Sequence, residues 1–198
     1  MSAAAISLNE MQSPVSLPYR GKVAMAGLII AESAIFTIFV VAYLFYIGKS
    51  LTGPTPREVL ETPIFFTICL LSSSLTIHYA GKFLERGKHG AFSSLWALTI
   101  LLGGLFLFGT GQEWHRLIYE HGLTISTNLF GTTYYSLVGL HAFHVTAGLI
   151  MLVVVAIFAF AGRVGGEHSR RVEVLSLYWH FVDVVWVVVF TVVYVLGR

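Results

Sequence analysis

The sequence contains a single cysteine and few charged residues. Aspartate, glutamate, lysine and arginine make up 11% of the 198 residues, whereas soluble domains carry about 25%. The lone cysteine, Cys69, lies within an apolar segment, so the chain itself offers neither a disulfide framework nor a cysteine-based metal site. The net charge of +2 gives no signal for nucleic acid or for an acidic substrate.

Several motifs that would indicate chemistry are also missing. The chain has no C-x-x-C-H haem attachment sequence, no Cys/His pattern for copper and no Gly-rich phosphate loop. Its apolar segments do not form the paired, interrupted halves seen in many transporters. Residues 1–18 lack a basic region followed by an apolar stretch, so we expect no cleavable signal peptide and expect the first span to direct insertion.

Long apolar segments are abundant instead. Hydrophobic residues make up 56% of the chain and the mean hydropathy is +0.79. A membrane-spanning helix needs about 20 mostly apolar residues, and the sequence therefore predicts an all-α membrane protein with a bundle of five transmembrane helices. A tail (1–22) precedes a single domain (23–198). The predicted spans lie near residues 23–47, 62–84, 91–113, 133–161 and 174–196.

Basic residues are distributed unevenly over the predicted connections. Of the 12 lysine and arginine residues, eight lie in the N-terminal tail, the second connection and the fourth connection, and four lie on the opposite side. Cytoplasmic loops carry the excess of basic residues. We therefore predict a cytoplasmic N-terminus and an external C-terminus.

Glu32 lies near the middle of the first predicted span. A central acidic residue costs about 2.5–3.5 kcal/mol on insertion scales, so its side chain must face the interior of the bundle. Two interpretations remain open from the sequence. Glu32 is either a hydrogen-bonding group that holds helices together, or a proton carrier or reactive carboxyl.

Two histidines, His141 and His144, share one face of the fourth predicted span. Gly139 and Gly148 flank them, and glycines at this spacing let another helix approach closely. The pair allows structural hydrogen bonding, metal or haem ligation, or proton transfer. A metal site would need at least three converging ligands. The candidates are His141, His144, His180, Glu32 and Asp183. An isolated H-x-x-H pattern is weak, which favours structural hydrogen bonding.

The fifth predicted span carries a polar and aromatic cluster, Tyr178, Trp179, His180, Asp183 and Trp186. His180 and Asp183 share a helix face and could pair with each other or with a neighbouring helix. The cluster is either an aromatic belt at the membrane surface or a docking face for another subunit or a lipid headgroup. Both interpretations remain open.

Two further ionisable residues are assigned by their position. Glu113 ends the third predicted span, and we expect it to be a solvated charge at the membrane surface. His78 falls toward one end of the second predicted span, and we expect it to lie apart from the other intramembrane ionisable groups.

Four stretches together resemble subunit III of the haem–copper terminal oxidases, from about residue 22 to 197. They are AESAIF, GQEWHRLI followed by LTISTNLFGTTYYSLVG, GLHAFHVTAGLIML, and SLYWHFVDVVWVVVFTVVYV. They occur in the order and spacing of that family. Mitochondrial members have seven helices, and this chain is similar to the shorter bacterial forms with five.

The resemblance implies an accessory role in a proton-pumping cytochrome c oxidase, which reduces O₂ to water in a bacterial plasma membrane. Haems and coppers belong to subunits I and II, and this chain holds no cofactor except phospholipid. Subunit III of this kind packs against subunit I, binds lipids in a cleft between helix groups, supports proton uptake and slows turnover-linked inactivation.

The resemblance also assigns individual residues. Glu32 falls at the family's carbodiimide-reactive intramembrane carboxylate. Our own hypothesis is that His144, His180 or Asp183 is its partner. No catalytic residue and no metal ligand are expected. The resemblance implies structural, lipid-cleft or subunit contacts for His141, His144, Tyr178, Trp179, His180, Asp183 and Trp186.

Other functions remain open, and the sequence barely distinguishes the first of them from a cytochrome c oxidase subunit. The electron donor is set by subunits I and II, so a subunit III of a bo-type quinol oxidase is the nearest alternative, and one attached to a nitric oxide reductase is a third. An independent transporter or proton channel, or a stand-alone haem or metal enzyme, belongs to a different class. The sequence does not distinguish the haem type, the cleft lipids or membership of a supercomplex.

Overall fold

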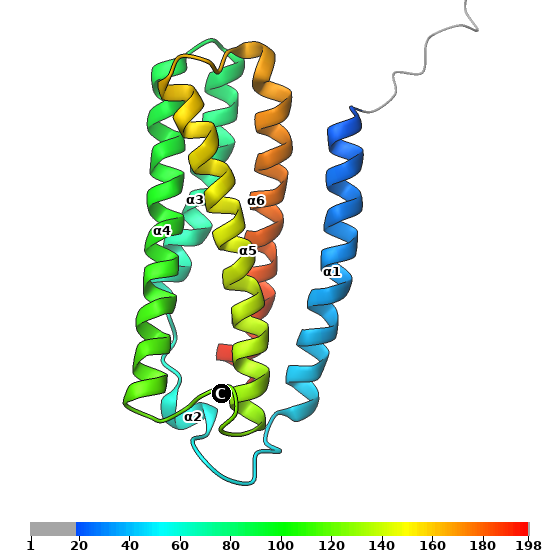
Figure 1. Cartoon of the computed structure of the whole chain (residues 1–198), viewed down its shortest axis with the longest axis vertical. Helices are drawn as coiled ribbons and strands as arrows, with labels where there is room; N and C mark the ends of the chain where they lie inside the picture. The colour runs from blue at the N-terminus through cyan, green and yellow to red at the C-terminus, as the bar shows by residue number, and fades with distance from the viewer. Residues whose placement is uncertain (1–18, 198) are drawn as a thin grey trace, which may run out of the picture.

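A computed structural model describes residues 19–197, and these residues form helices and connections without a β-strand (Figure 1). Five helices are long and apolar enough to cross a membrane, which confirms the predicted all-α architecture with five spans. They are α1 (Arg20–Tyr46), α3 (Ile64–Glu85), α4 (His89–Tyr119), α5 (Leu129–Phe160) and α6 (Ser169–Phe190). Shorter elements are α2 (Pro56–Val59), the 3-10 turn η1 (Gly166–His168) and the π-helical turn η2 (Thr191–Leu196), which continues α6. Residues 1–18 of the predicted tail, and Arg198, lie outside the described residues.

The helices extend beyond the apolar runs from which they were predicted. The third span was predicted to end at residue 113, whereas α4 continues to Tyr119. The fourth was predicted to start near residue 133, whereas α5 starts at Leu129. At that start the Asn128 side chain accepts a hydrogen bond of 2.8 Å from the backbone N–H of Gly131, which caps the helix. Hydropathy marks the lipid-facing length of a helix, and at α5 this cap sets where the more polar first turn begins.

Glycines in the left-handed conformation follow several helices, and two of them stand in short connections. Gly87 follows α3 with φ +71°, and Gly162 follows α5 with φ +69°. This conformation places the next backbone N–H groups against the last helical carbonyls, as in the bond of 2.9 Å from Lys88 N–H to the Phe83 carbonyl. These glycines therefore allow the tight reversals that make consecutive helices antiparallel.

Helices α3, α4, α5 and α6 form an antiparallel bundle, and α1 packs mainly against α5 and α6 (Figure 1). The start of α1 lies at the end of the molecule where α3 ends and α6 begins, and α2 and the end of α6 lie at the opposite end. Only Phe36 and Tyr43 of α1 are buried. Most of the α1 surface is therefore exposed in the described chain.

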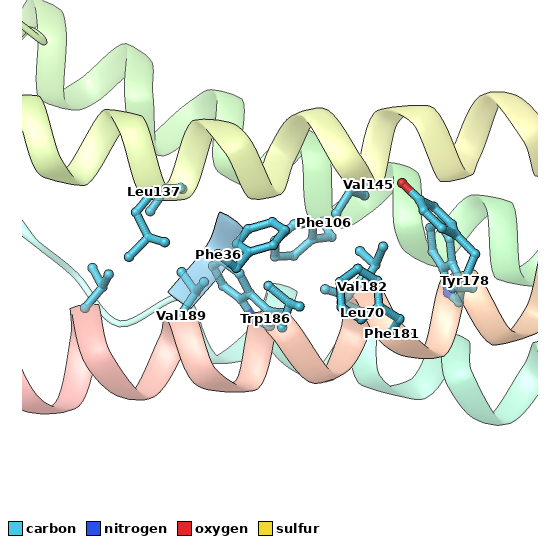
Figure 2. Close-up of a cluster of buried hydrophobic side chains, with 14 of the residues drawn as sticks. Phe36, Leu70, Phe106, Leu137, Val145, Tyr178, Phe181, Val182, Trp186 and Val189 are labelled. Carbon is cyan, nitrogen blue, oxygen red and sulfur yellow. The ribbon is translucent and has the colours of Figure 1, made fainter. Parts of the chain in front are cut away.

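The core runs along the bundle and includes side chains from α1 and from all four bundle helices (Figure 2). Phe36 of α1 lies edge-on to Phe181 of α6, with ring centroids 6.4 Å apart. The fully buried Trp179 packs against Gly103 of α4 and Gly148 of α5. Glycines at both positions let the indole fill the space where three helices meet.

Candidate functional site

Glu32 of α1 is hydrogen-bonded to His144 of α5, with 3.1 Å between Glu32 Oε2 and His144 Nε2. His144 Nδ1 lies 2.8 Å from the Leu140 carbonyl. A carbonyl only accepts, so Nδ1 carries a hydrogen. Nε2 then either accepts from a protonated Glu32 or, in an imidazolium, donates to the carboxylate. Of the three partners considered for Glu32, His144 is the one within hydrogen-bonding distance.

His144 also contacts two other helices. The Phe36 ring of α1 lies 5.0 Å from the His144 ring, and the Tyr178 hydroxyl of α6 donates to the His144 carbonyl over 3.2 Å. The side chain of His144 is 8% exposed and that of Glu32 is 22% exposed. This pair is therefore the polar centre of the junction between α1, α5 and α6.

His141 behaves differently from His144. It is fully buried, and neither ring nitrogen has a hydrogen-bond partner among residues 19–197. Its ring stacks on Trp186 with centroids 5.0 Å apart and an interplanar angle of 29°, and it meets the edge of Phe106 at 5.8 Å. For His141 the structure shows aromatic packing in place of the expected hydrogen bonding.

Asp183 and His180 of α6 meet a common partner on α3, the hydroxyl of Ser74. This hydroxyl donates to Asp183 Oδ2, and its oxygen lies 2.9 Å from His180 Nδ1. Asp183 is 3% exposed, and its other oxygen has no partner in the described part of the chain. The sequence had indicated that His180 and Asp183 share a face, but gave no means of choosing Ser74.

The two tryptophans of α6 bind hydroxyls of α3 and do not form a surface belt. Trp179 Nε1 donates to Ser73 Oγ over 2.8 Å, and Trp186 Nε1 donates to Thr67 Oγ1 over 3.2 Å. Both tryptophans are at most 1% exposed. The aromatic-belt interpretation is therefore wrong for these two residues, and their burial also removes them from a docking face for another subunit.

A second polar cluster, missed in the sequence, lies at the end of α6. The Tyr194 hydroxyl, on η2, donates to Glu113 Oε2 over 2.8 Å, and the Tyr134 hydroxyl lies 3.4 Å from that of Tyr194. Glu113 Oε1 is buried without a partner among the described residues. The expectation of a solvated charge at Glu113 was wrong, because the π-helical turn brings a tyrosine from 81 residues away over its carboxylate.

His78 lies beside His180, with ring centroids 6.5 Å apart. Both residues line a pocket of about 260 Å³ between the end of α3 and the start of α6. The expectation that His78 lies apart from the other intramembrane ionisable groups was therefore also wrong.

An apolar groove of about 520 Å³ separates part of α1 from α6. Its walls include Ile29, Phe36, Val40, Phe181, Val184 and Val188. The hydroxyls of Ser33 and Thr37 also line it, but each donates to a carbonyl of α1 itself, over 2.7 Å. The groove therefore offers mainly hydrocarbon contacts, with His180 at one side.

The ionisable residues considered as metal ligands do not converge. Within residues 19–197, no group of three or more His, Cys, Asp or Glu side chains is arranged to hold a metal ion. Glu32 is bound to His144 on α5, whereas His180 and Asp183 are bound to Ser74 on α3.

Comparisons with known proteins agree on one family. The sequence profile of cytochrome c oxidase subunit III matches residues 21–198. Cytochrome c oxidase subunit 3 of Synechocystis sp. is 38% identical over 175 residues, which cover 85% of this chain and 72% of the relative. Its counterpart from Bacillus subtilis is 33% identical over 190 residues, covering 93% and 92%. The cytochrome bo(3) ubiquinol oxidase subunit 3 of Pseudomonas aeruginosa is 32% identical over 171 residues, covering 85% and 81%.

Proposed function

This chain belongs to the cytochrome c oxidase subunit III family, and on that premise we propose that it is a non-catalytic accessory subunit of a proton-pumping haem–copper oxidase. The redox centres of the complex belong to subunits I and II. The observation that carries this proposal is the use of the intramembrane ionisable groups. They bind one another and hydroxyls across helices, as in Glu32–His144 and Asp183–Ser74, and such contacts fasten a bundle.

The subunit contacts subunit I through an exposed apolar helix surface. Helix α1 buries only two of its side chains within the chain, so it is a natural element to lie against lipid or a neighbour. The chain is multi-pass in a bacterial plasma membrane, with its N-terminus in the cytoplasm and its C-terminus outside. The excess of basic residues at the end where α1 starts supports this orientation.

The groove between α1 and α6 holds a phospholipid acyl chain. Its volume of about 520 Å³ and its apolar walls suit hydrocarbon, because large exposed apolar surfaces mark membrane-interaction sites or ligand-binding grooves. A lipid seated there fills the space that α1 leaves open. It thereby couples α1 to α6 and slows inactivation of the catalytic core during turnover.

Glu32 is the carboxyl that reacts with hydrophobic carbodiimides, and the subunit supports proton uptake by the complex. Cytochrome c is the proposed electron donor, since relatives from Synechocystis sp. and Bacillus subtilis are named cytochrome c oxidase subunit 3. Quinol is the second candidate, favoured by the Pseudomonas aeruginosa relative.

Co-purification tests the proposal. The chain is tagged, the membranes are solubilised in a mild detergent, and the bound proteins are identified and assayed with reduced cytochrome c and with quinol. We expect a haem- and copper-containing partner that reduces O₂. A chain that migrates alone would indicate an independent transporter. A Soret band in the isolated chain would identify a haem enzyme, and either result would contradict the proposal.

A further inference from the structure

A chain of hydrogen bonds connects a buried carboxyl to a partly exposed histidine. Asp183 Oδ2 accepts from the Ser74 hydroxyl, and the same oxygen of Ser74 lies 2.9 Å from His180 Nδ1. The second oxygen of Asp183 is buried without a partner among the described residues. Leaving a carboxylate oxygen unpaired in an apolar interior is costly. Helix fastening alone would be served equally well by an asparagine or a serine.

His180, the outer end of this series of hydrogen bonds, opens into the pocket between α3 and α6. His180 lines the pocket together with Ser169, Glu173 and Ser176 of α6. Ser169 is the first residue of α6, and the helical rise from there to His180 spans about 16 Å. The pocket therefore extends from the end of the bundle to the depth of His180.

The opposite wall of the pocket is formed by α3. Like the α6 wall, it carries polar side chains near the end of the bundle. His78, Lys82 and Glu85 line it, and Gly81 lies among them. A Cβ atom at Gly81 would meet nothing within 4 Å, so the absent side chain leaves this part of the pocket open. Water and protons can reach His180 along a wall that carries ionisable groups.

We propose that Asp183 is a proton-binding site that exchanges with the aqueous phase only at the end of the bundle where α3 ends and α6 begins, through Ser74 and His180. In one state His180 Nδ1–H donates to Ser74, and Ser74 donates to an ionised Asp183. A proton added at His180 Nε2 moves the Nδ1 proton to the Ser74 oxygen, and the original hydroxyl proton of Ser74 moves to Asp183 Oδ2.

The result of this step is a neutral Asp183 that donates to Ser74, which in turn donates to a neutral His180. One proton enters and one O–H bond forms at Asp183, so the charge balances. Within residues 19–197, Asp183 makes no side-chain hydrogen bond other than that to Ser74, and its other oxygen is unpartnered. The proton therefore returns by the same route, and Asp183 stores a proton without passing it across the membrane.

Other ionisable groups near α6 do not interrupt the hydrogen bonds between Asp183, Ser74 and His180. The helices that pack against α6 carry Arg20, Lys22 and Glu32 on α1, His78, Lys82 and Glu85 on α3, and His141 and His144 on α5. Helix α6 itself carries Arg170, Arg171, Glu173 and His180, and the adjoining turn η1 carries Glu167 and His168. Glu32 is bound to His144, and Lys22 forms an ion pair with Glu173 over 2.6 Å. The proposal concerns this chain alone and is independent of the electron donor.

Infrared spectroscopy of the purified complex, transferred from H₂O to D₂O at a series of pH values, tests the proposal. The carbonyl stretch of protonated Asp183 is assigned by its loss in Asp183→Asn, and its shift on deuteration is timed. We expect the shift to occur in the unmodified chain. Ser74→Ala removes the relay and Gly81→Leu fills the pocket. Ser74→Ala should slow the shift about tenfold, as expected for the loss of one hydrogen bond at a barrier. Gly81→Leu should also slow it, because the added side chain obstructs access to His180 from the end of the bundle.

Matched variants separate the relay from general damage. Ser74→Thr keeps the hydroxyl. Ser72→Ala makes the same deletion at a serine whose side chain has no hydrogen-bond partner among the described residues. Gly104→Leu adds the same bulk where a Cβ meets nothing within 4 Å. All three should exchange at the rate of the unmodified chain. The proposal is overturned if no Asp183 carboxyl band exists at any pH at which the complex is intact, if the band never shifts, or if Ser74→Ala and Gly81→Leu exchange as fast as their controls.

Discussion

Glu32 of α1 and His144 of α5 form a hydrogen bond of 3.1 Å within the apolar part of the bundle. A second polar contact of α1, the ion pair between Lys22 and Glu173, lies at the exposed start of the helix. Since α1 buries few side chains, the Glu32–His144 bond is a substantial part of what orients it. Its contribution can be measured directly.

We predict that Glu32 and His144 are coupled energetically by about 1 kcal/mol, the usual size of a hydrogen bond between membrane helices. A double-mutant cycle with Glu32→Leu and His144→Leu measures this coupling energy from the free energies of unfolding in mixed micelles. Glu32→Gln is the control. Its amide can donate to Nε2, so it should retain most of the stability that Glu32→Leu loses. Additive effects of the two leucine variants would contradict the prediction.

Hydrophobic carbodiimides should label Glu32 in preference to the other carboxyls of the chain. The group lies beside His144 with 22% of its side chain exposed, so a reagent dissolved in lipid can reach it. Glu32→Gln should abolish labelling of the chain as measured by mass spectrometry of its peptides. Glu113→Gln, which removes a carboxyl at the far end of α4, should leave labelling intact. Unchanged labelling of Glu32→Gln would show that another residue is the reactive one.

The packing around Trp179 should tolerate no added carbon. A Cβ at Gly148 would lie 2.8 Å from a ring carbon of Trp179, and one at Gly103 would lie 2.9 Å away. Such overpacking costs about 1–3 kcal/mol, more than the gain of about 1 kcal/mol in helix propensity. Gly103→Ala should therefore lower the unfolding temperature. At Gly104, on the same helix, a Cβ meets nothing within 4 Å, so equal destabilisation by Gly104→Ala would argue against this packing.

The number and type of the long helices could be predicted from hydropathy, whereas the contacts between them could not. A run of about 20 apolar residues in lipid must satisfy its own backbone groups and so becomes a helix. Hydropathy does not show which face of that helix is buried. Helix α6 is apolar on nearly all sides, so its sequence gave no indication that Trp179 and Trp186 point inward toward α3.

The hydrogen-bond partners of the buried carboxyls could not be predicted from the sequence for a related reason. Ser74 binds Asp183 from 109 residues away, and Tyr194 binds Glu113 from 81 residues away. Helical periodicity describes neighbours within one helix only. The pairing of Glu32 with one of three candidates needed the packing of α1 on α5, which nothing in the separate segments specifies.

Replacing His141 by an apolar ring should not weaken the bundle. Both of its ring nitrogens are buried without partners among the described residues, and replacing a buried unpaired polar group by an apolar one of similar shape is close to neutral or stabilising. We expect His141→Phe, which keeps the stacking on Trp186, to match or exceed the unfolding temperature of the unmodified chain. His141→Ala is the comparison, since it leaves a cavity and should be less stable by about 2–5 kcal/mol. A marked loss of stability in His141→Phe would reveal a polar role for the imidazole.

The loss of O₂ reduction during turnover, measured in the oxidase with and without this chain, tests the accessory role most directly. If the chain fastens and protects a catalytic core that holds all the haem and copper, the depleted complex should keep its haem absorbance and most of its initial rate, and then inactivate faster than the intact complex. Stoichiometric loss of haem or copper on removal of the chain, or identical inactivation of the two preparations, would contradict it.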